Sequence, residues 1–236
     1  MRTTRQSILQ IIQRQRTETV GGLAKELDLA PATVRRHLDI LQRDGLVEFS
    51  EVRKGAGRPE HSFSLTDRGH EMQPKGYDSL LLALVIELSR TNADQMSGKT
   101  GAEALQAALT RLGLEVAREY AESASKSVVD EAAGQSATGQ PATDPRVAAA
   151  VRALQDRDFG PEVRHGPQGA TIVLSNCPFR SVAMADDAIC SYDMTILQAI
   201  LGTPVRRDRC ISRGHDCCEY FAPAGPVAMD GEPQGN

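Results

Sequence analysis

The residues of this chain best suited to chemistry are five cysteines, which all lie between positions 177 and 218. They are Cys177, Cys190, Cys210, Cys217 and Cys218. Thiolates ligate metals and iron–sulfur clusters, and pairs of thiols form disulfides. The N-terminal stretch sets arginines around short apolar steps, unlike a signal peptide, and no run reaches membrane-spanning length. We therefore expect a cytoplasmic protein, in which clustered cysteines are metal ligands or redox sensors rather than structural disulfides.

The spacing of the cysteines helps to distinguish a zinc site from an iron–sulfur cluster. Twelve residues stand between Cys177 and Cys190, and 27 stand between Cys190 and Cys218. Structural zinc sites usually take ligands from close CxxC pairs, and the adjacent Cys217 and Cys218 are awkward for one small ion. An iron–sulfur cluster is wider and accepts thiolates from scattered loops and strand ends. The spacing favours a cluster and leaves zinc and bare thiols as alternatives.

The elements predicted around the cysteines place them near element ends. The run ATIVLSN predicts a buried strand that ends just before Cys177, and DDAICSYDMTILQAILG predicts a helix with Cys190 in its first turn. The helix dipole favours a thiolate there. The runs PVRRDRCI and CCEYF predict two strands around the turn SRGHD. If the hairpin loop contains an even number of residues, Cys210 stands opposite Cys217 as a cross-strand pair, and Cys218 points to the other face of the sheet.

The first 72 residues predict a winged helix-turn-helix domain. Ile8, Ile11 and Ile12 recur at helical spacing in a first helix over residues 4–15. Thr19 is placed to cap a second helix, and Pro31 stands where a third begins. Alternating strands then flank the glycine-rich tip RKGAGRP. Helix, helix-turn-helix and hairpin, in this order, are the elements of a winged helix.

Charge and side-chain chemistry indicate double-stranded DNA as the partner of this domain. Residues 1–70 carry 12 Lys and Arg against 9 Asp and Glu, although the whole chain has a net charge of −4. The second helix of the motif enters the major groove, where arginine pairs with guanine, and a basic wing follows the DNA backbone. The expected contacts are Thr33, Arg35, Arg36 and His37 from the helix, and Arg53, Lys54 and Arg58 from the tip.

The remainder of the chain divides by composition into four regions. Residues 76–123 are expected to be helical, 124–146 a linker or mobile loop whose first part could extend the preceding helix, 147–222 the cysteine-bearing domain and 223–236 a flexible tail. The fold class expected for the whole chain is α+β.

The helical region carries an apolar stripe that predicts a homodimer. A regulator that binds paired half-sites needs a twofold axis, although the stripe could instead pack in the chain's own core. The stripe consists of Tyr77, Leu80, Leu81, Leu84, Val85 and Leu88.

Two patterns resemble known families. The run LAKELDLAPATVRRHLDILQRDGLV, with the tip RKGAGRP, resembles the winged-helix domain of ArsR-like bacterial repressors. The run NCPF, then Cys190, AILGTPV and a glycine-containing turn before Cys218, resembles the C-terminal domain of SufR-type repressors of iron–sulfur cluster assembly genes. The second resemblance implies that Cys177, Cys190 and Cys218 help to hold a [4Fe-4S] cluster in a repressing homodimer. It provides no fourth ligand, for which the candidates are Cys217, Cys210, His215, Asp186, Asp187 and a small thiol from solution.

The predicted function is a DNA-binding repressor of cluster assembly genes whose operator affinity depends on the cluster. The alternative is a winged-helix repressor without a cluster that responds to zinc or through a reversible Cys210–Cys217 disulfide. An enzyme is not expected, because the sequence has no phosphate loop, no Cys/His pairing in context and no paired carboxylates with a site around them. Neither a small-molecule substrate nor a membrane partner is expected.

Overall fold

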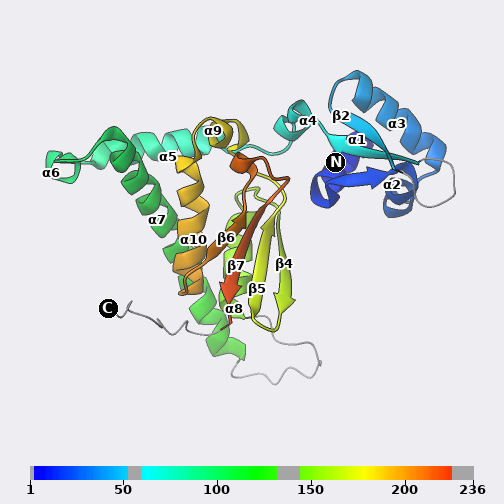
Figure 1. The fold of residues 1–236 in the computed structure, drawn as a ribbon. Coiled ribbons are helices and arrows are strands. Elements are labelled where there is room, and N and C mark those ends of the chain that lie inside the picture. The colour runs from blue at the N-terminus through cyan, green and yellow to red at the C-terminus, as the bar shows by residue number, and fades with distance from the viewer. Residues whose placement is uncertain (1–2, 53–59, 132–143, 225–236) are drawn as a thin grey trace, which may run out of the picture.

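The computed structural model describes residues 3–52, 60–131 and 144–224, and these residues form two bodies with separate apolar cores (Figure 1). One core is built from residues between Ile8 and Leu65, and the other from residues between Leu80 and Ala222. Helices and antiparallel strands occur in both bodies, so the predicted α+β class is confirmed.

The N-terminal body has the element order of a winged helix. Its elements are α1 (Thr4–Gln15), β1 (Thr17–Thr19), α2 (Val20–Leu27), α3 (Pro31–Arg43), β2 (Val47–Val52), β3 (Glu60–Leu65) and α4 (Asp67–Glu71). The Thr19 side chain accepts a hydrogen bond from the Gly22 amide and caps α2, as predicted. Pro31 begins α3, and Gly45, with φ of +69°, follows its end.

A small sheet and three helices enclose the first core. The antiparallel strands lie in the order β1-β3-β2. Strand β1 has only three residues, too few to show an alternating pattern, and the sequence did not predict it. Ile8, Ile12, Leu23 and Val34 are fully buried here, and each contributes about 1.5–3 kcal/mol. This packing fixes which face of α3 remains on the surface.

Residues 72–76 connect the two bodies, and three helices begin the second. They are α5 (Tyr77–Arg90), α6 (Ala93–Met96) and α7 (Gly101–Glu131). Helix α7 continues into the stretch expected to be a linker, so residues 124–131 are helical. The next part of that stretch, residues 132–143, and most of the expected tail, residues 225–236, lie outside the described residues.

The cysteine-bearing region is a four-stranded antiparallel sheet packed with helices. Its elements are α8 (Pro145–Gln155), β4 (Pro161–Gly166), β5 (Gly169–Leu174), α9 (Arg180–Ala185), η1 (Asp187–Ile189), α10 (Cys190–Leu201), β6 (Arg206–Arg209), η2 (Ile211–Arg213) and β7 (Cys218–Pro223). The strand order is β4-β5-β7-β6, and α7, α8 and α10 pack against one another beside it (Figure 1). Ile172 and Tyr220 from the sheet meet Leu154, Ile196 and Leu197 from the helices in the core.

The connection between β6 and β7 differs from the predicted tight hairpin. Its residues form the 3-10 turn η2, and Gly214, with φ of +82°, ends this turn. The last paired residues are Arg209 and Glu219, so Cys210 lies beyond the ladder. The longer connection changes where Cys210 and Cys217 point.

Within the described ranges, no helix combines the length and apolar character that crossing a bilayer requires.

Candidate sensor site and nucleic-acid interface

Helix α3 exposes a polar face opposite its buried residues. Thr33, Arg35 and Arg36 are exposed, and His37 is half-buried. Each residue of a helix turns the side-chain direction by about 100°. Arg36 therefore points away from the buried Val34, whereas Arg35 lies on the flank of the helix.

A shallow hollow joins this face of α3 to the start of α1 and gathers three arginines. Its lining includes Arg5, Arg36, His37 and Arg43. His37 Nδ1 is buried, and no described residue forms a hydrogen bond with it. Guanidinium groups on one face suit both phosphates and guanine edges. Sequence reasoning missed Arg5 and Arg43, although the spacing of seven residues from Arg36 to Arg43 is a signal that they share a face.

The predicted wing contacts cannot be placed in the same way. Strand β2 ends at Val52 and β3 begins at Glu60, and Arg53, Lys54 and Arg58 lie outside the described residues.

Four cysteines line one small cavity in the C-terminal body. They are Cys177 after β5, Cys190 at the start of α10, Cys210 before η2 and Cys218 at the start of β7. The remaining lining is mostly apolar, with Asp193, Asn176 and Ser212 as polar additions. The three cysteines predicted as a set, Cys177, Cys190 and Cys218, are therefore brought together, and Cys210 joins them.

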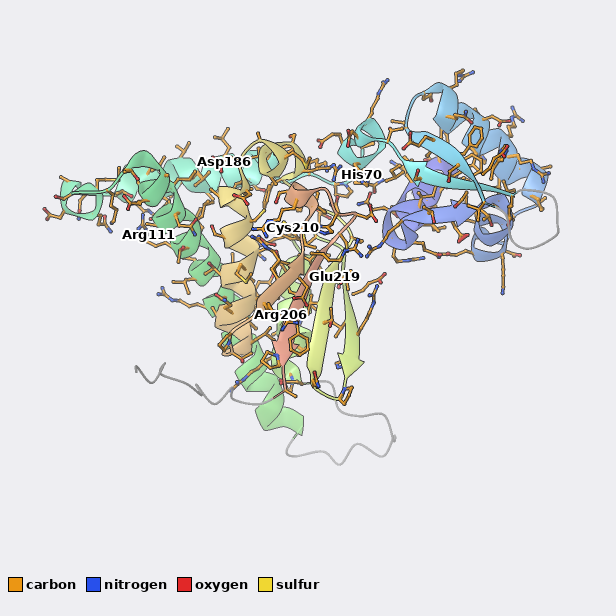
Figure 2. All side chains as sticks on the ribbon, viewed as in Figure 1. His70, Arg111, Asp186, Arg206, Cys210 and Glu219 are labelled. Carbon is orange, nitrogen blue, oxygen red and sulfur yellow. The ribbon has the colours of Figure 1, made fainter. Side chains whose placement is uncertain are left out.

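Cys210 lies at the centre of this group. Its Sγ is 4.0 Å from Cys190 Sγ and 4.0 Å from Cys218 Sγ. Ser212 Oγ is 3.0 Å from Cys210 Sγ, and the Ile211 amide donates to Cys218 Sγ at 3.4 Å. Figure 2 shows Cys210 in the space between α10 and the strands. Residues distant in sequence thus meet at one buried point.

The predicted cross-strand pair of Cys210 and Cys217 is wrong. Cys217 is fully buried outside this cavity, and its thiol lies 3.5 Å from Glu219 Oε1. The pair assumed an even hairpin loop, but η2 and Gly214 lengthen the connection and turn Cys210 inward. Cys210 and Cys218 share the site instead.

The other candidates for a fourth ligand lie outside the cavity lining. His215 Nδ1 is 3.0 Å from the Cys210 carbonyl oxygen and accepts from the Cys210 amide or donates to that oxygen according to its tautomer. Asp186 is exposed and caps η1 by accepting from the Ala188 amide at 2.9 Å, and Asp187 is exposed as well. These residues stabilise the backbone near the site.

Burial and mutual hydrogen bonds set the protonation of the four thiols. Donation toward Cys210, together with burial, raises the pKa of Cys190 and of Cys218 far above the ordinary thiol range. Burial raises the pKa of Cys177 to about 12. The same hydrogen bonds from Cys190 and Cys218 lower the pKa of Cys210 strongly. The arrangement therefore concentrates negative charge on the Cys210 sulfur.

A buried carboxyl group borders the thiols. Burial raises the pKa of Asp193 to about 6, and the Tyr220 hydroxyl donates a hydrogen bond to its Oδ2. Burial also raises the pKa of Tyr220. This pair joins α10 to β7 at the lining of the cavity.

The segment that carries Cys177 is bonded along its length to the connection between the two bodies. Asn176 Nδ2 donates to the Pro74 carbonyl at 3.0 Å, and Lys75 Nζ donates to the Cys177 carbonyl at 3.2 Å. The Gly76 amide donates to the Pro178 carbonyl at 3.2 Å.

The same segment also contacts the winged helix itself. Gln13 of α1 donates to the Ser175 carbonyl, and Arg180 forms an ion pair with Asp67 of α4 at 2.9 Å. On the connection, the Tyr77 hydroxyl is 2.7 Å from Ser181 Oγ. We name residues 175–181 the docking segment. Sequence reasoning missed these contacts because the partners are 102 to 162 residues apart, and no local pattern marks them.

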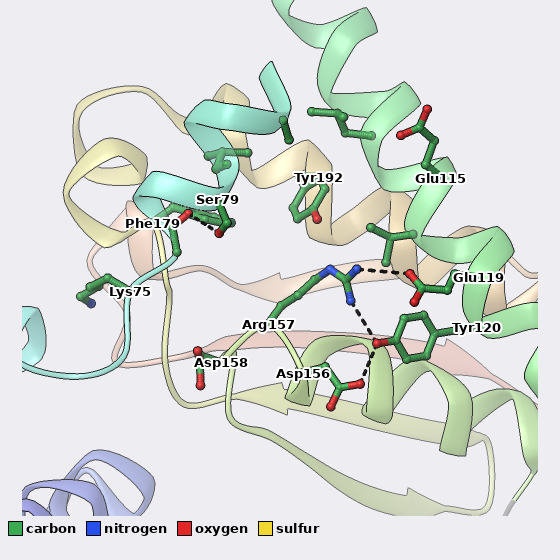
Figure 3. A pocket seen from close by; sticks show the side chains of 15 residues that line it. Lys75, Ser79, Glu115, Glu119, Tyr120, Asp156, Arg157, Asp158, Phe179 and Tyr192 are labelled. Atoms are coloured by element: carbon green, nitrogen blue, oxygen red, sulfur yellow. Dashed lines mark hydrogen bonds and ion pairs between the residues drawn. The ribbon is translucent and has the colours of Figure 1, made fainter. Parts of the chain in front are cut away.

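A larger pocket of about 570 Å³ lies between α5, α7 and residues 156–158 (Figure 3). Its polar groups already bind one another. The Tyr120 hydroxyl donates to Asp156 Oδ2 at 2.6 Å, and Arg157 Nη1 donates to that hydroxyl at 3.4 Å. Arg157 also pairs with Glu119 at 3.8 Å. These contacts hold α7 to the end of α8.

Among the described residues, no group of three or more His, Cys, Asp or Glu side chains is arranged to hold a single metal ion.

Comparison with known proteins identifies the N-terminal region. Residues 3–48 match the family described as helix-turn-helix domain. Among solved structures, a transcriptional regulator homologue from Pyrococcus horikoshii OT3 is 29% identical, with a TM-score of 0.26, over 37% of this chain and 83% of that chain. Bacillus subtilis PadR, solved with operator DNA, is 15% identical, with a TM-score of 0.28, over 66% of this chain and 92% of that chain. No match was found among curated proteins. The chain thus carries a helix-turn-helix domain, the type with which transcriptional regulators bind DNA.

Proposed function

We propose that the protein is a homodimeric repressor of iron–sulfur cluster assembly genes, and that a [4Fe-4S] cluster held by Cys177, Cys190 and Cys218 controls its operator affinity. One observation carries this proposal. Cysteines from four separate segments line one buried cavity, and one of those segments is bonded to the DNA-binding domain.

The donor set of the cavity fits an iron–sulfur cluster. Thiolates are the usual protein ligands of such clusters, and apolar surroundings shield them from water. The cavity now measures about 10 Å³, which is about enough for one water molecule, so a cluster requires the cysteine-bearing segments to stand further apart. When bound, a cluster would supply iron in place of the protons of the cysteine thiols that hold it.

The docking segment connects this cavity to the DNA-binding domain through hydrogen bonds and an ion pair. A change in the position of Cys177 displaces the carbonyls of Ser175, Cys177 and Pro178, which are bonded to Gln13, Lys75 and Gly76. Arg180, with a side chain only 16% exposed, carries the same displacement to Asp67. Because these contacts join the winged helix to the cysteine cavity, cluster loss changes the orientation of α3. A ligand shifts such an equilibrium by its different affinity for the two states.

The apolar face of α5 supports a dimer. Of the predicted stripe, Leu80 is buried, and Tyr77 and Leu84 pack against the core of the same chain. Leu81, Val85 and Leu88 remain 52–64% exposed, and neighbouring Leu82 and Ile86 extend the patch. The patch suits a second copy, which would place two α3 helices on two half-sites.

The testing experiment is anaerobic purification of the full chain and of the Cys190→Ser variant, followed by absorption spectroscopy and iron, sulfide and zinc analysis. We expect about four iron and four sulfide per wild-type chain and loss of both in the variant. Specific operator binding should weaken in the variant, while salt-sensitive nonspecific binding remains. A wild-type protein without iron after anaerobic reconstitution, or a variant with undiminished iron, contradicts the proposal.

A thiol–disulfide regulator is the second candidate, and the two separations of 4.0 Å around Cys210 favour it. Two thiols would lose two protons and two electrons to hydrogen peroxide, which is reduced to two water molecules, and form one disulfide. The geometry selects Cys190 or Cys218 as the partner of Cys210, in place of Cys217. Redox-dependent operator binding by a colourless, iron-free protein would select this candidate.

A further inference from the structure

Cys210 occupies a position that distinguishes it from every other candidate for the fourth ligand. Cys210 is 1% exposed, and its sulfur lies at the same distance from the sulfurs of Cys190 and Cys218. Cys177 lines the same cavity. A ligand that bridges the three proposed cysteines at this point would meet Cys210 as well.

The alternatives are held away by contacts of their own. Cys217 faces Glu219, and its local charges include Arg16 of the DNA-binding domain. The His215 ring lies against the Cys210 backbone, and Asp186 caps η1. Asp193 does line the cavity, but the Tyr220 hydroxyl already binds its carboxylate. Each would have to leave its present partner, or share it, to reach an iron atom.

The surroundings of the Cys210 sulfur also suit a thiolate ligand. Ser212 Oγ is 3.0 Å from this sulfur, and the sulfurs of Cys190 and Cys218 each lie 4.0 Å from it. Metal ligation needs the thiolate, which hydrogen-bond donors at such distances stabilise.

The backbone at Cys210 belongs to a connection and not to a regular element. Cys210 lies between the end of β6 and the short turn η2, outside the hydrogen-bonded ladder. Cys190 and Cys218, by contrast, begin regular elements. A displacement of Cys210 would therefore leave the paired residues of β6 and β7 in place.

We propose that Cys210 is the fourth protein ligand, so that four thiolates from one chain complete the coordination of the cluster. This inference rests on the proposed function. It excludes both Cys217 and a small thiol from solution as the fourth ligand.

The test compares Cys210→Ser with the matched control Cys217→Ser, both as full chains reconstituted anaerobically with iron and sulfide. Cys217 is equally buried and belongs to the same connection. We expect wild-type iron, sulfide and absorption in Cys217→Ser, and at least a twofold loss of iron or a changed spectrum in Cys210→Ser. The inference is overturned if Cys210→Ser keeps wild-type iron and spectrum.

A measurement on the wild-type protein keeps the test decisive if Cys210→Ser does not fold. The cluster-loaded protein is titrated with 2-mercaptoethanol and followed by absorption and circular dichroism in the visible range. Four protein thiolates leave no position for an added thiol, so no spectral change is expected. A saturable change would show an exchangeable fourth ligand and overturn the inference. Wild-type protein that takes up no iron at all would contradict the proposed function instead.

Discussion

At the scale of single residues, the direction in which a side chain leaves helix α3 decides which arginines can contact DNA. Arg35 and Arg36 are neighbours in sequence, yet only Arg36 lies opposite the buried Val34 and lines the hollow with Arg5 and Arg43. A side chain in that position can reach a base edge, whereas one on the flank is better placed for the DNA backbone. The same reasoning applies to Cys217 and Cys218, which are adjacent and occupy different surroundings.

Replacing Arg36 by alanine should reduce operator discrimination more than replacing Arg35. A bidentate contact to guanine contributes about 1–3 kcal/mol of discrimination, whereas a phosphate contact weakens binding to all sequences alike. Fluorescence anisotropy with operator DNA and single-base variants measures both effects. Iron content and folding should remain unchanged in both variants. Equal discrimination by Arg36→Ala and the wild type would show that another residue reads the operator.

At the scale of elements, the junction between α1, α4 and the docking segment holds the two bodies together. His70 Nδ1 is 2.9 Å from Gln13 Oε1, and Gln13 in turn binds the Ser175 carbonyl. Burial, with smaller contributions from Arg180 and Lys75, lowers the pKa of His70 to about 4. A neutral histidine is therefore part of the junction at neutral pH, and its protonation opposes this arrangement.

The junction should lose stability in mild acid because of His70. An unfolded histidine has a pKa near 6.5, so between about pH 6.5 and 4 the unfolded chain binds more protons than the folded chain. The contribution of neutral His70 to the free energy of unfolding is fully present above pH 6.5 and is lost as the pH falls toward 4. Partial exposure reduces the loss to about 1–3 kcal/mol.

Urea unfolding as a function of pH measures this effect in the wild type and in His70→Gln. The variant should show a smaller decrease in the free energy of unfolding between pH 6.5 and 4. His61→Gln is the control, because His61 is exposed on β3. An unchanged pH profile in His70→Gln would remove His70 from this role.

At the scale of the whole molecule, the exposed part of α5 lies on the larger body, away from the DNA-binding domain (Figure 1). Leu81 and Val85 are 64% and 52% exposed, and both lie on one face with Leu88. Burial of this face between two copies would leave both α3 helices accessible. Simultaneous binding of two half-sites strengthens operator binding without any new base contact.

The double substitution Leu81→Glu/Val85→Glu should shift the protein from dimer to monomer. Placing carboxylates in an apolar interface leaves them without solvation or partners. Sedimentation equilibrium should show at least a tenfold weaker association and anisotropy a weaker operator affinity, with iron content unchanged. Val182→Glu on α9, which replaces another exposed apolar residue, is the control and should remain dimeric. A dimeric double variant would place the interface elsewhere.

The sequence by itself determined the local features of this protein. Thr19 and Pro31 marked helix starts because caps act over one turn, and the periodic apolar residues of α1 and α3 defined the core of the helix-turn-helix domain. The sequence also placed Cys190 in the first turn of a helix, and α10 begins at Cys190. Short β1 and the length of α7 were less evident, because three residues show no period and helix ends depend on tertiary contacts.

Only the tertiary structure decided that Cys210 joins Cys177, Cys190 and Cys218 in one cavity, and how that cavity is connected to the DNA-binding domain. The 3-10 turn η2 places Cys210 beside Cys190 and Cys218, whereas the sequence had placed it opposite Cys217. The docking segment is bonded to residues about one hundred positions away in the sequence. Periodicity and spacing describe neighbours along the chain, whereas these contacts depend on the path of a connection and on the packing of two bodies. The types of residue were therefore readable from the sequence, but their partners were set by the fold.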